Sequence, residues 1–203
     1  MPELPEVETT VRGLARVLDG RRMVLIETDD GHRLSLNDPR RFGSLDLMPT
    51  AEVTAWPPIA ALGPEPLGGA LQGSDLKQRL SERKAAIKLM LLDQKIVAGL
   101  GNIYVCEALF RARIDPRKAA GRVSKVKFEA LAGAIPDVLE DAIAAGGSSL
   151  RDFAQPDGEL GYFSKQFDVY GREGEECRGG CGSQVRRIVQ GGRSTFFCAS
   201  CQK

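Results

Sequence analysis

The hydrophobic and polar positions divide the chain into a strand-rich first part and a helical middle. Residues 9–18 place apolar side chains at helical spacing. Asp30-Gly31 is typical of a hairpin turn. Short apolar or alternating runs predict three strands, at residues 22–27, 32–37 and 42–47. We therefore expect β-structure near the start of the chain.

Residues 49–73 separate these two parts. This stretch holds five of the eleven prolines and four glycines, which is typical of a linker or a loop-rich seam between domains. We expect Ser74-Asp75 to cap the first helix after it, Pro136 to kink the last helix, and Gly146-Gly147 to end that helix. The periodicity predicts helices at residues 74–83, 85–92, 102–111 and 124–145, followed by a loop at 152–172.

Composition and length exclude several classes of protein. The chain has 203 residues, of which 42% are hydrophobic and 27% charged, so disorder and a collagen-like fold are excluded. No apolar run approaches the roughly 20 residues of a membrane span, and the start lacks the basic and apolar regions of a secretory signal. We expect one domain or two small ones, no membrane partner, and a cytoplasmic protein.

Four of the five cysteines form two closely spaced pairs. A reducing cytosol disfavours two disulfides, whereas this spacing suits a tetrahedral zinc site. The metal would replace the core that a module of about 27 residues cannot build. Redox pairs and coincidence are the alternatives. The predicted ligands of one structural Zn²⁺ are Cys177, Cys181, Cys198 and Cys201, and Cys106 is predicted to be a buried packing residue.

Charge is balanced over the whole chain but not over its last part. The net charge of +1 does not by itself indicate a nucleic-acid partner. From Cys177 to Lys203, however, there are five basic residues and no acidic ones. Such a local patch is the usual electrostatic footprint of phosphate binding, and a solvated face is the alternative.

The first candidate for chemistry is the amino terminus. Removal of Met1 would expose Pro2 as a secondary amine, and an N-terminal amine is partly neutral at pH 7. A neutral amine can attack an electrophilic carbon and form an iminium. Glu3 and Glu6 lie close enough in sequence to shuttle protons or hold a cationic intermediate. The alternative is an ordinary capped, extended terminus.

The segment Gly99-Leu100-Gly101-Asn102-Ile103-Tyr104 is the second candidate. Two glycines before a helix allow close approach of a backbone, and the amides of a helix start form a phosphate site. Asn102, predicted at the N-cap, would add its side-chain amide. The alternative is a tight turn that Asn102 caps.

The segment Asn37-Asp38-Pro39-Arg40-Arg41-Phe42-Gly43 is the third candidate. Side chains two residues apart on a strand point the same way, so Arg40 and Phe42 form a pair. Such a pair could enter a duplex, with the ring unstacking bases and the guanidinium meeting the orphaned base. The alternative is a surface arginine and a core phenylalanine.

In combination and order, these motifs resemble formamidopyrimidine-DNA glycosylases. The resemblance covers nearly the whole chain. It rests on Met-Pro-Glu-Leu-Pro-Glu-Val-Glu-Thr at the start, Asn-Asp-Pro-Arg-Arg-Phe-Gly from Asn37, Leu-Gly-Pro-Glu-Pro-Leu from Leu62, the segments Asp93–Tyr104, Gly146–Phe153, Gly161–Phe163 and Val169–Arg172, and the four-cysteine module.

The resemblance implies a base-excision enzyme that flips oxidised purines, such as 8-oxoguanine or formamidopyrimidines, out of duplex DNA. Pro2 matches the nucleophile that attacks the sugar C1′ and displaces the base. Glu3 matches the acid that assists opening of the sugar ring, and Glu6 matches a structural acidic residue of the active site. The iminium then permits elimination at both phosphates, which is the lyase activity. Arg40 and Phe42 match the residues that fill the vacated space.

The same resemblance implies further contacts with double-stranded DNA that carries an oxidised purine or an abasic site. Lys88 and Asn102 match DNA-contacting positions of the helix–two-turn–helix region. Tyr170 and Arg193 match phosphate contacts, with Arg193 at the tip of the zinc-finger hairpin. Residues 161–170 belong to the loop that closes over the lesion. The implied protein is a monomer, cytoplasmic and associated with the nucleoid through DNA.

The implied fold class is α+β and multidomain. The resemblance predicts a truncated N-terminal catalytic β-sandwich at residues 1–62 and a helix–two-turn–helix DNA-binding domain at 63–154. A lesion-recognition loop and connector follows at 155–176, and a four-cysteine zinc-finger hairpin at 177–203.

The chain departs from the family pattern by an internal shortening of the N-terminal domain. The first predicted strand runs almost directly into Asp30-Gly31, so several strands' worth of sequence is absent. The absent part would carry the family's catalytic lysine and a phosphate-binding histidine, and His32 does not match that histidine. The alternative to a working glycosylase is therefore a catalytically impaired remnant that binds damaged DNA. A zinc-ribbon interaction protein unconnected with DNA is the third hypothesis.

Overall fold

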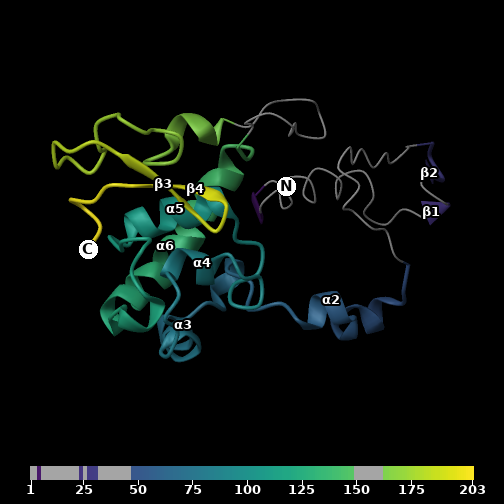
Figure 1. Cartoon of the computed structure of the whole chain (residues 1–203). Helices are drawn as coiled ribbons and strands as arrows, with labels where there is room; N and C mark the ends of the chain where they lie inside the picture. Colours follow the sequence, from purple (N-terminus) through teal and green to yellow (C-terminus); the bar gives the residue numbers. More distant parts are fainter. Residues whose placement is uncertain (1–3, 6–22, 25–26, 32–46, 149–161) are drawn as a thin grey trace.

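The computed structural model of the chain describes residues 4–5, 23–24, 27–31, 47–148 and 162–203 (Figure 1). Several predictions fall outside these residues and are neither supported nor opposed by the structure. They are the helix at 9–18, the strand at 32–37, the strand at 42–47 except for its last residue, and the site residues Pro2, Glu3, Glu6, Arg40 and Phe42.

Two short strands lie in the described part of the N-terminal region. Met23–Val24 (β1) and Glu27–Thr28 (β2) pair antiparallel, with Met23 opposite Thr28. The prediction of one strand over 22–27 is therefore wrong, because Val24 and Glu27 belong to two strands that pair with each other. An apolar run specifies that a segment is buried or paired, but it does not specify which neighbour it pairs with.

The proline-rich segment is a connection built from short helical turns. It contains η1 (Thr50–Ala55), α2 (Pro57–Ala60) and η2 (Leu67–Gly69), and none of these elements has a buried residue. Pro57 is the first residue of α2, where a missing backbone N–H costs nothing. In Figure 1 this segment, which contains α2, leads into the helical body.

Four helices form the helical body, and their positions agree with the sequence periodicity. They are α3 (Gly73–Leu80), α4 (Ile87–Leu91), α5 (Asn102–Arg111) and α6 (Lys125–Ala144), with a 3₁₀ turn η3 (Ala120–Arg122) before α6. The bounds predicted for α5 are confirmed. The cap predicted for α3 is wrong, because Gln72 is the N-cap and the Ser74 hydroxyl lies inside the helix, 3.5 Å from an Asp75 carboxylate oxygen.

The two ends of α6 follow from local chemistry. The Ser124 hydroxyl accepts a hydrogen bond from the backbone N–H of Lys127 at 3.4 Å, which caps the helix start. Pro136 lies inside the helix. Gly146 and Gly147 take φ values of +75° and +85°, and the Gly147 N–H returns to the Ala142 carbonyl at 2.8 Å. Glycine suits this left-handed ending, so the predicted stop is confirmed.

The helices enclose one apolar core. Helix α6 packs against both α3 and α5, and fully buried side chains such as Leu76, Leu109 and Ile135 fill the space between them. Tyr104 stacks on Phe163 of the 3₁₀ turn η4 (Phe163–Gln166), with 6.0 Å between the ring centroids. This packing places the segment after residue 162 against α5. No helix of the described residues is long and apolar enough to cross a bilayer.

The last part of the chain is a two-stranded hairpin on top of α5. Strands β3 (Arg186–Gln190) and β4 (Arg193–Phe197) pair antiparallel through the turn Gly191-Gly192. Both glycines have positive φ values, +56° and +73°, as the tightest hairpin turns require. A second apolar cluster joins the hairpin to α5, and its members include Cys106, Phe110, Val169, Val185 and Phe196. Cys106 is 1% exposed, so its predicted packing role is confirmed.

Candidate functional site

The turn between α4 and α5 is held in shape by Gln94. Its side-chain amide donates to the Leu100 carbonyl at 3.1 Å, and its carbonyl oxygen accepts from the Gly99 N–H at 2.6 Å. Gly99 has a φ of +72°, a left-handed conformation that favours glycine. The turn therefore presents the start of α5 in a fixed orientation.

The N-terminal segment contacts this same turn. The Leu4 N–H donates to the Gly99 carbonyl at 2.9 Å. A side chain at Gly99 would place its Cβ only 2.8 Å from the Leu4 Cβ, so glycine is required here for a second reason. Leu4 is thus anchored to the turn that leads into α5. Pro2, Glu3 and Glu6, which flank Leu4 in sequence, are outside the described residues.

Asn102 links α5 to two other parts of the chain. Its amide nitrogen donates to the Tyr170 hydroxyl at 3.2 Å and to the Ser194 carbonyl at 3.1 Å. A carbonyl only accepts, so this contact fixes which end of the amide faces Ser194. Asn102 is the first residue of α5 and Gly101 is its N-cap, so the prediction of Asn102 as N-cap is wrong. Its side chain faces the β3–β4 hairpin, which we call the finger hairpin, and makes no cap.

The side-chain amide oxygen of Asn102, Oδ1, is a buried acceptor with no hydrogen-bond partner among the described residues. Such groups are rare because burying an unpaired acceptor costs about 1–3 kcal/mol. The structure thus leaves one unused acceptor at the point where α5, Tyr170 and the finger hairpin meet.

Lys88 of α4 is enclosed by the finger hairpin. Its side chain is fully buried, and its ammonium donates to the Ser194 carbonyl at 3.2 Å and to the Thr195 hydroxyl at 2.8 Å. A buried charge requires such partners. The ammonium therefore holds β4 on the helical body. The DNA contact that the resemblance implies for Lys88 stays a prediction.

Glu107 positions Tyr170. Its carboxylate is fully buried in α5 and accepts three backbone N–H groups, from Asp168, Val169 and Tyr170, at 2.7, 3.0 and 2.8 Å. Burial raises the pKa of this carboxyl, and the three hydrogen bonds oppose that rise. The segment 168–170 is thus clamped to the same helix that carries Asn102.

Arg193 begins β4, next to Ser194, and is exposed. Four of the predicted DNA-binding positions are therefore neighbours in the structure, either directly or through Ser194. They are Lys88, Asn102, Tyr170 and Arg193, and they come from α4, α5, the segment after η4 and the finger hairpin.

The four predicted metal ligands form a compact cluster. Their sulfur atoms all lie within 4.8 Å of one another. The Cys177 and Cys201 sulfurs are 3.7 Å apart, and those of Cys181 and Cys198 are 3.5 Å apart. Zinc–sulfur bonds of about 2.3 Å in a tetrahedron place ligand sulfurs about 3.8 Å apart. The cluster therefore fits a four-cysteine metal centre.

The thiols of the cluster differ in acidity. The Ser183 N–H lowers the pKa of Cys181 to about 6, whereas burial raises the pKa of Cys177 to about 12. A thiolate binds a metal and a thiol does not. Cys181 is thus suited to bind a cation at neutral pH, and a metal bound by all four sulfurs would require Cys177 to release its proton.

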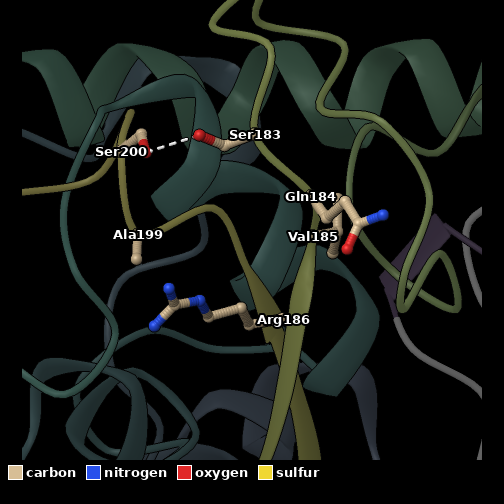
Figure 2. Close-up of a pocket in the computed structure, with 6 residues that line it drawn as sticks. All are labelled: Ser183, Gln184, Val185, Arg186, Ala199 and Ser200. Atoms are coloured by element: carbon tan, nitrogen blue, oxygen red, sulfur yellow. Dashed lines mark hydrogen bonds between the residues drawn. The ribbon is translucent and has the colours of Figure 1, made fainter.

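A hollow of about 270 Å³ on the finger contains none of the predicted site residues (Figure 2). Arg186 is the one charged residue among those that line it, and the Ser183 and Ser200 hydroxyls are hydrogen-bonded to each other at 2.7 Å. Residues that line this hollow can therefore serve as control positions for substitutions, because they lie on the same finger but are not predicted to contact DNA.

The sequence did not single out Glu107, Ser194 or Thr195. The one available signal for Glu107 is its charge inside the apolar run Ile103–Phe110, which predicts a buried helix. Ser194 and Thr195 give no signal, because Ser194 acts through its backbone carbonyl and the Thr195 hydroxyl is placed beside Lys88 only by the hairpin register.

Comparisons with known proteins agree on one family. The model of the family described as the formamidopyrimidine-DNA glycosylase H2TH domain matches residues 62–154. The formamidopyrimidine-DNA glycosylase of Novosphingobium aromaticivorans is 49% identical over 272 residues, covering 100% of both chains. That of Erythrobacter litoralis is 48% identical over the same length and coverage.

Solved structures give the same result. The MutM (Fpg) protein of Thermus thermophilus superimposes with a TM-score of 0.84 at 34% identity, covering 99% of this chain and 98% of that one. A Lactococcus lactis Fpg in complex with DNA containing an abasic site superimposes with a TM-score of 0.74 at 36% identity, covering 82% of this chain and 60% of that one.

This chain is shorter than its relatives, and the lengths in these comparisons show where the missing residues lie. The alignment with the Novosphingobium protein spans 272 residues and this chain has 203, so about 69 positions have no residue here. Since both chains are covered throughout, the missing positions are internal. This agrees with the internal shortening inferred from the motifs.

Proposed function

Because the chain belongs to the formamidopyrimidine-DNA glycosylase family, we propose that it removes oxidised purines such as 8-oxoguanine and formamidopyrimidines from duplex DNA and then cleaves the abasic site. The chain is a base-excision repair glycosylase. The observation that carries the proposal is the meeting of Asn102, Tyr170 and the finger hairpin at Ser194, because it holds polar groups from three separate segments together at the start of α5.

The proposed chemistry begins at Pro2. The neutral secondary amine attacks the sugar C1′ and forms a carbon–nitrogen bond, and the base leaves with the electrons of the glycosidic bond. Glu3 assists opening of the sugar ring, and Glu6 supports the site structurally. The resulting iminium acidifies the adjacent sugar carbon, so both phosphates can be eliminated. The Leu4–Gly99 contact supports this assignment, because it anchors the N-terminal segment beside α5.

In the proposed DNA interface, some side chains contact the DNA and the buried Lys88 holds the protein segments in place. Tyr170 and Asn102 contact phosphate at the start of α5, where the helix dipole favours an anion, and Asn102 does so by turning one amide N–H from the Tyr170 hydroxyl to a phosphate oxygen. Arg193 contacts phosphate from the hairpin tip. Lys88 contributes by holding β4 in place beside α5. Arg40 and Phe42 fill the space vacated by the flipped base.

We propose Zn²⁺ as the metal of the cysteine cluster. Four sulfur donors close to tetrahedral spacing suit zinc, and a four-cysteine set leaves no position open for catalysis. The role of the ion is therefore structural: Cys177, Cys181, Cys198 and Cys201 would hold it and so join the two ends of the finger.

We retain the division into four segments ending at residues 62, 154, 176 and 203. The finer fold that goes with it is a shortened N-terminal β-sandwich followed by the helix–two-turn–helix domain, the connector and the zinc-finger hairpin. We also propose a cytoplasmic monomer whose partner is double-stranded DNA with an oxidised purine or an abasic site.

Strand cleavage tests the proposal directly. We expect the purified chain to cut a labelled duplex at 8-oxoguanine and at an abasic site, and to leave an undamaged duplex intact. The products should carry the phosphate ends that elimination leaves, and a denaturing gel resolves them. Tight binding to the abasic duplex with no cleavage above the undamaged control would contradict the proposal and favour the DNA-binding remnant.

A further inference from the structure

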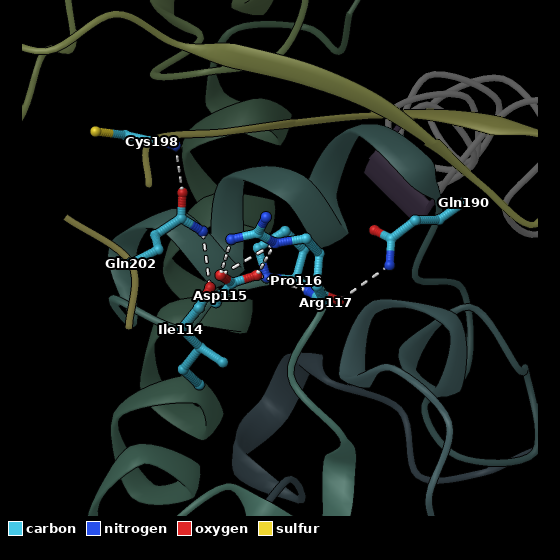
Figure 3. Close-up of polar contacts among 7 residues, drawn as sticks. All are labelled: Ile114, Asp115, Pro116, Arg117, Gln190, Cys198 and Gln202. Atoms are coloured by element: carbon cyan, nitrogen blue, oxygen red, sulfur yellow. Dashed lines mark hydrogen bonds and ion pairs between the residues drawn. The ribbon is translucent and has the colours of Figure 1, made fainter. Parts of the chain in front are cut away.

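The side chain of Gln202 bridges the metal cluster and the helical body. It is 1% exposed. Its carbonyl oxygen accepts from the Cys198 N–H at 2.8 Å, and its amide nitrogen donates to the Ile114 carbonyl at 2.8 Å (Figure 3). An N–H only donates and a carbonyl only accepts, so the orientation of the amide is fixed by its partners. Cys198 is a predicted metal ligand, and Ile114 follows α5.

The loop that receives Gln202 is itself a platform for the finger. The Arg117 guanidinium donates to both Asp115 carboxylate oxygens, at 2.9 and 2.6 Å, and these two hydrogen bonds fix the orientation of the guanidinium plane. In that position it lies 4.7 Å from the centre of the Phe197 ring, in β4. Gln190 of β3 adds a hydrogen bond to the Pro116 carbonyl at 3.4 Å. Figure 3 shows the polar contacts that this short loop makes.

The same loop also holds α4. The Ile87 N–H donates to the Lys118 carbonyl at 2.8 Å, and the Lys88 N–H donates to the Pro116 carbonyl at 3.4 Å. Lys88 in turn binds Ser194 and Thr195 through its ammonium. A continuous set of contacts thus runs from Cys198 through Gln202 and the loop to the part of β4 that meets Asn102.

We propose that Gln202 is a positioning residue that couples metal binding in the cysteine cluster to the placement of the finger hairpin on DNA. The inference rests on the proposed function, since it requires a bound metal and a duplex. A metal that orders Cys198 fixes Gln202, and Gln202 fixes the finger on the α5 platform. Coupling of this kind is reciprocal in the binding free energies, so a bound duplex raises the affinity of the cluster for its metal. Because the duplex holds the finger in its metal-bound arrangement, we expect this gain to appear as slower release of the metal.

The chemistry of the amide makes the inference testable with near-isosteric changes. Gln202→Glu keeps an acceptor for the Cys198 N–H but sets a carboxylate oxygen against the Ile114 carbonyl. Gln202→Met keeps the length of the side chain and removes both hydrogen bonds. Gln184→Glu is the control for the change of charge. Gln184 lies on the same finger and lines the hollow of Figure 2, and its replacement by glutamate adds the same charge as Gln202→Glu.

The experiment measures metal release from the zinc-loaded full chain into an excess of a chromophoric chelator, with and without saturating duplex containing an abasic-site analogue. Metal content and duplex affinity are measured on the same samples. For the wild type and Gln184→Glu, we expect the duplex to slow release at least about fivefold, the lower end of typical coupling between sites. For Gln202→Glu and Gln202→Met, we expect this factor to fall to less than about twofold, with a matching loss of duplex affinity.

Three results would overturn the inference. The first is a duplex-dependent slowing in both Gln202 variants equal to that of the wild type. The second is a wild-type chain that holds metal and binds duplex but releases metal at the same rate with and without it. In both cases the proposed function stands. The third, a wild-type chain with no duplex affinity at all, contradicts the proposed function and the coupling together.

Discussion

Removal of the metal from the cysteine cluster is expected to abolish specific duplex binding. Cys177 and Cys198 are buried, and the apolar cluster around them is small. A module of about 27 residues depends on its metal for folding, so the finger opens when the ion is lost. Ser194 and Thr195 then leave Lys88, and an unpaired buried charge strongly destabilises what remains of the contact.

We expect Cys198→Ser and chelator-treated wild type to bind an abasic duplex at least about 100-fold more weakly than the zinc-loaded chain, or about 2.7 kcal/mol. Fluorescence anisotropy gives the affinity, and elemental analysis should find one metal ion per chain before treatment. Cys106→Ala is the control for loss of a buried thiol, since Cys106 lies in the same apolar cluster as Cys177 and Cys198 but is not one of the four predicted metal ligands. Metal-free, folded protein with unchanged duplex affinity would contradict this account of the finger.

Replacement of both Asn102 and Arg193 by alanine is expected to give the second large effect. In the proposed interface the two side chains approach phosphate from α5 and from the hairpin tip, so their loss would remove contacts from both sides of it. Loss of the arginine charge should reduce the slope of log affinity against log salt by about 0.9. We expect duplex affinity to fall roughly 30- to 100-fold at moderate salt, about 2–3 kcal/mol.

The control for this double variant is Arg186→Ala. Arg186 is exposed on the same finger and lines the hollow of Figure 2, so its removal changes net charge equally. Titrations of each variant with duplex at several salt concentrations distinguish a specific phosphate contact from non-specific electrostatic attraction. If Arg186→Ala weakens binding as much as Arg193→Ala, the basic residues form a solvated face. If the double variant binds as tightly as wild type, the interface is elsewhere.

Features with a local cause could be predicted from the sequence. The bounds of α5 follow from its apolar period and the glycines before it, and α6 ends where Gly146 and Gly147 allow a left-handed turn. The spacing of the cysteines predicted a cluster whose sulfur atoms the structure brings within 4.8 Å. In each case the determining residues lie within a few positions of one another or repeat a known ligand spacing.

Features that depend on a distant partner could not be predicted. Glu107 finds its three N–H donors about sixty residues away, and Gln202 finds Ile114 eighty-eight residues away. Asn102 is drawn to Ser194 by tertiary packing, which overrides its preference for capping. The run 22–27 is a different case, because its two strands pair with each other a few residues apart and an apolar run does not indicate whether it forms one strand or two.

Trapping of the covalent intermediate tests the central claim most directly. The chain is mixed with a duplex containing 8-oxoguanine, and separately with one containing an abasic site, and borohydride is added to reduce the iminium to a stable amine. We predict one cross-linked protein–DNA species with each duplex, absent when Pro2 is replaced by glycine. Binding of both duplexes without any cross-linked species would contradict the claim that this shortened chain performs base excision through its N-terminal proline.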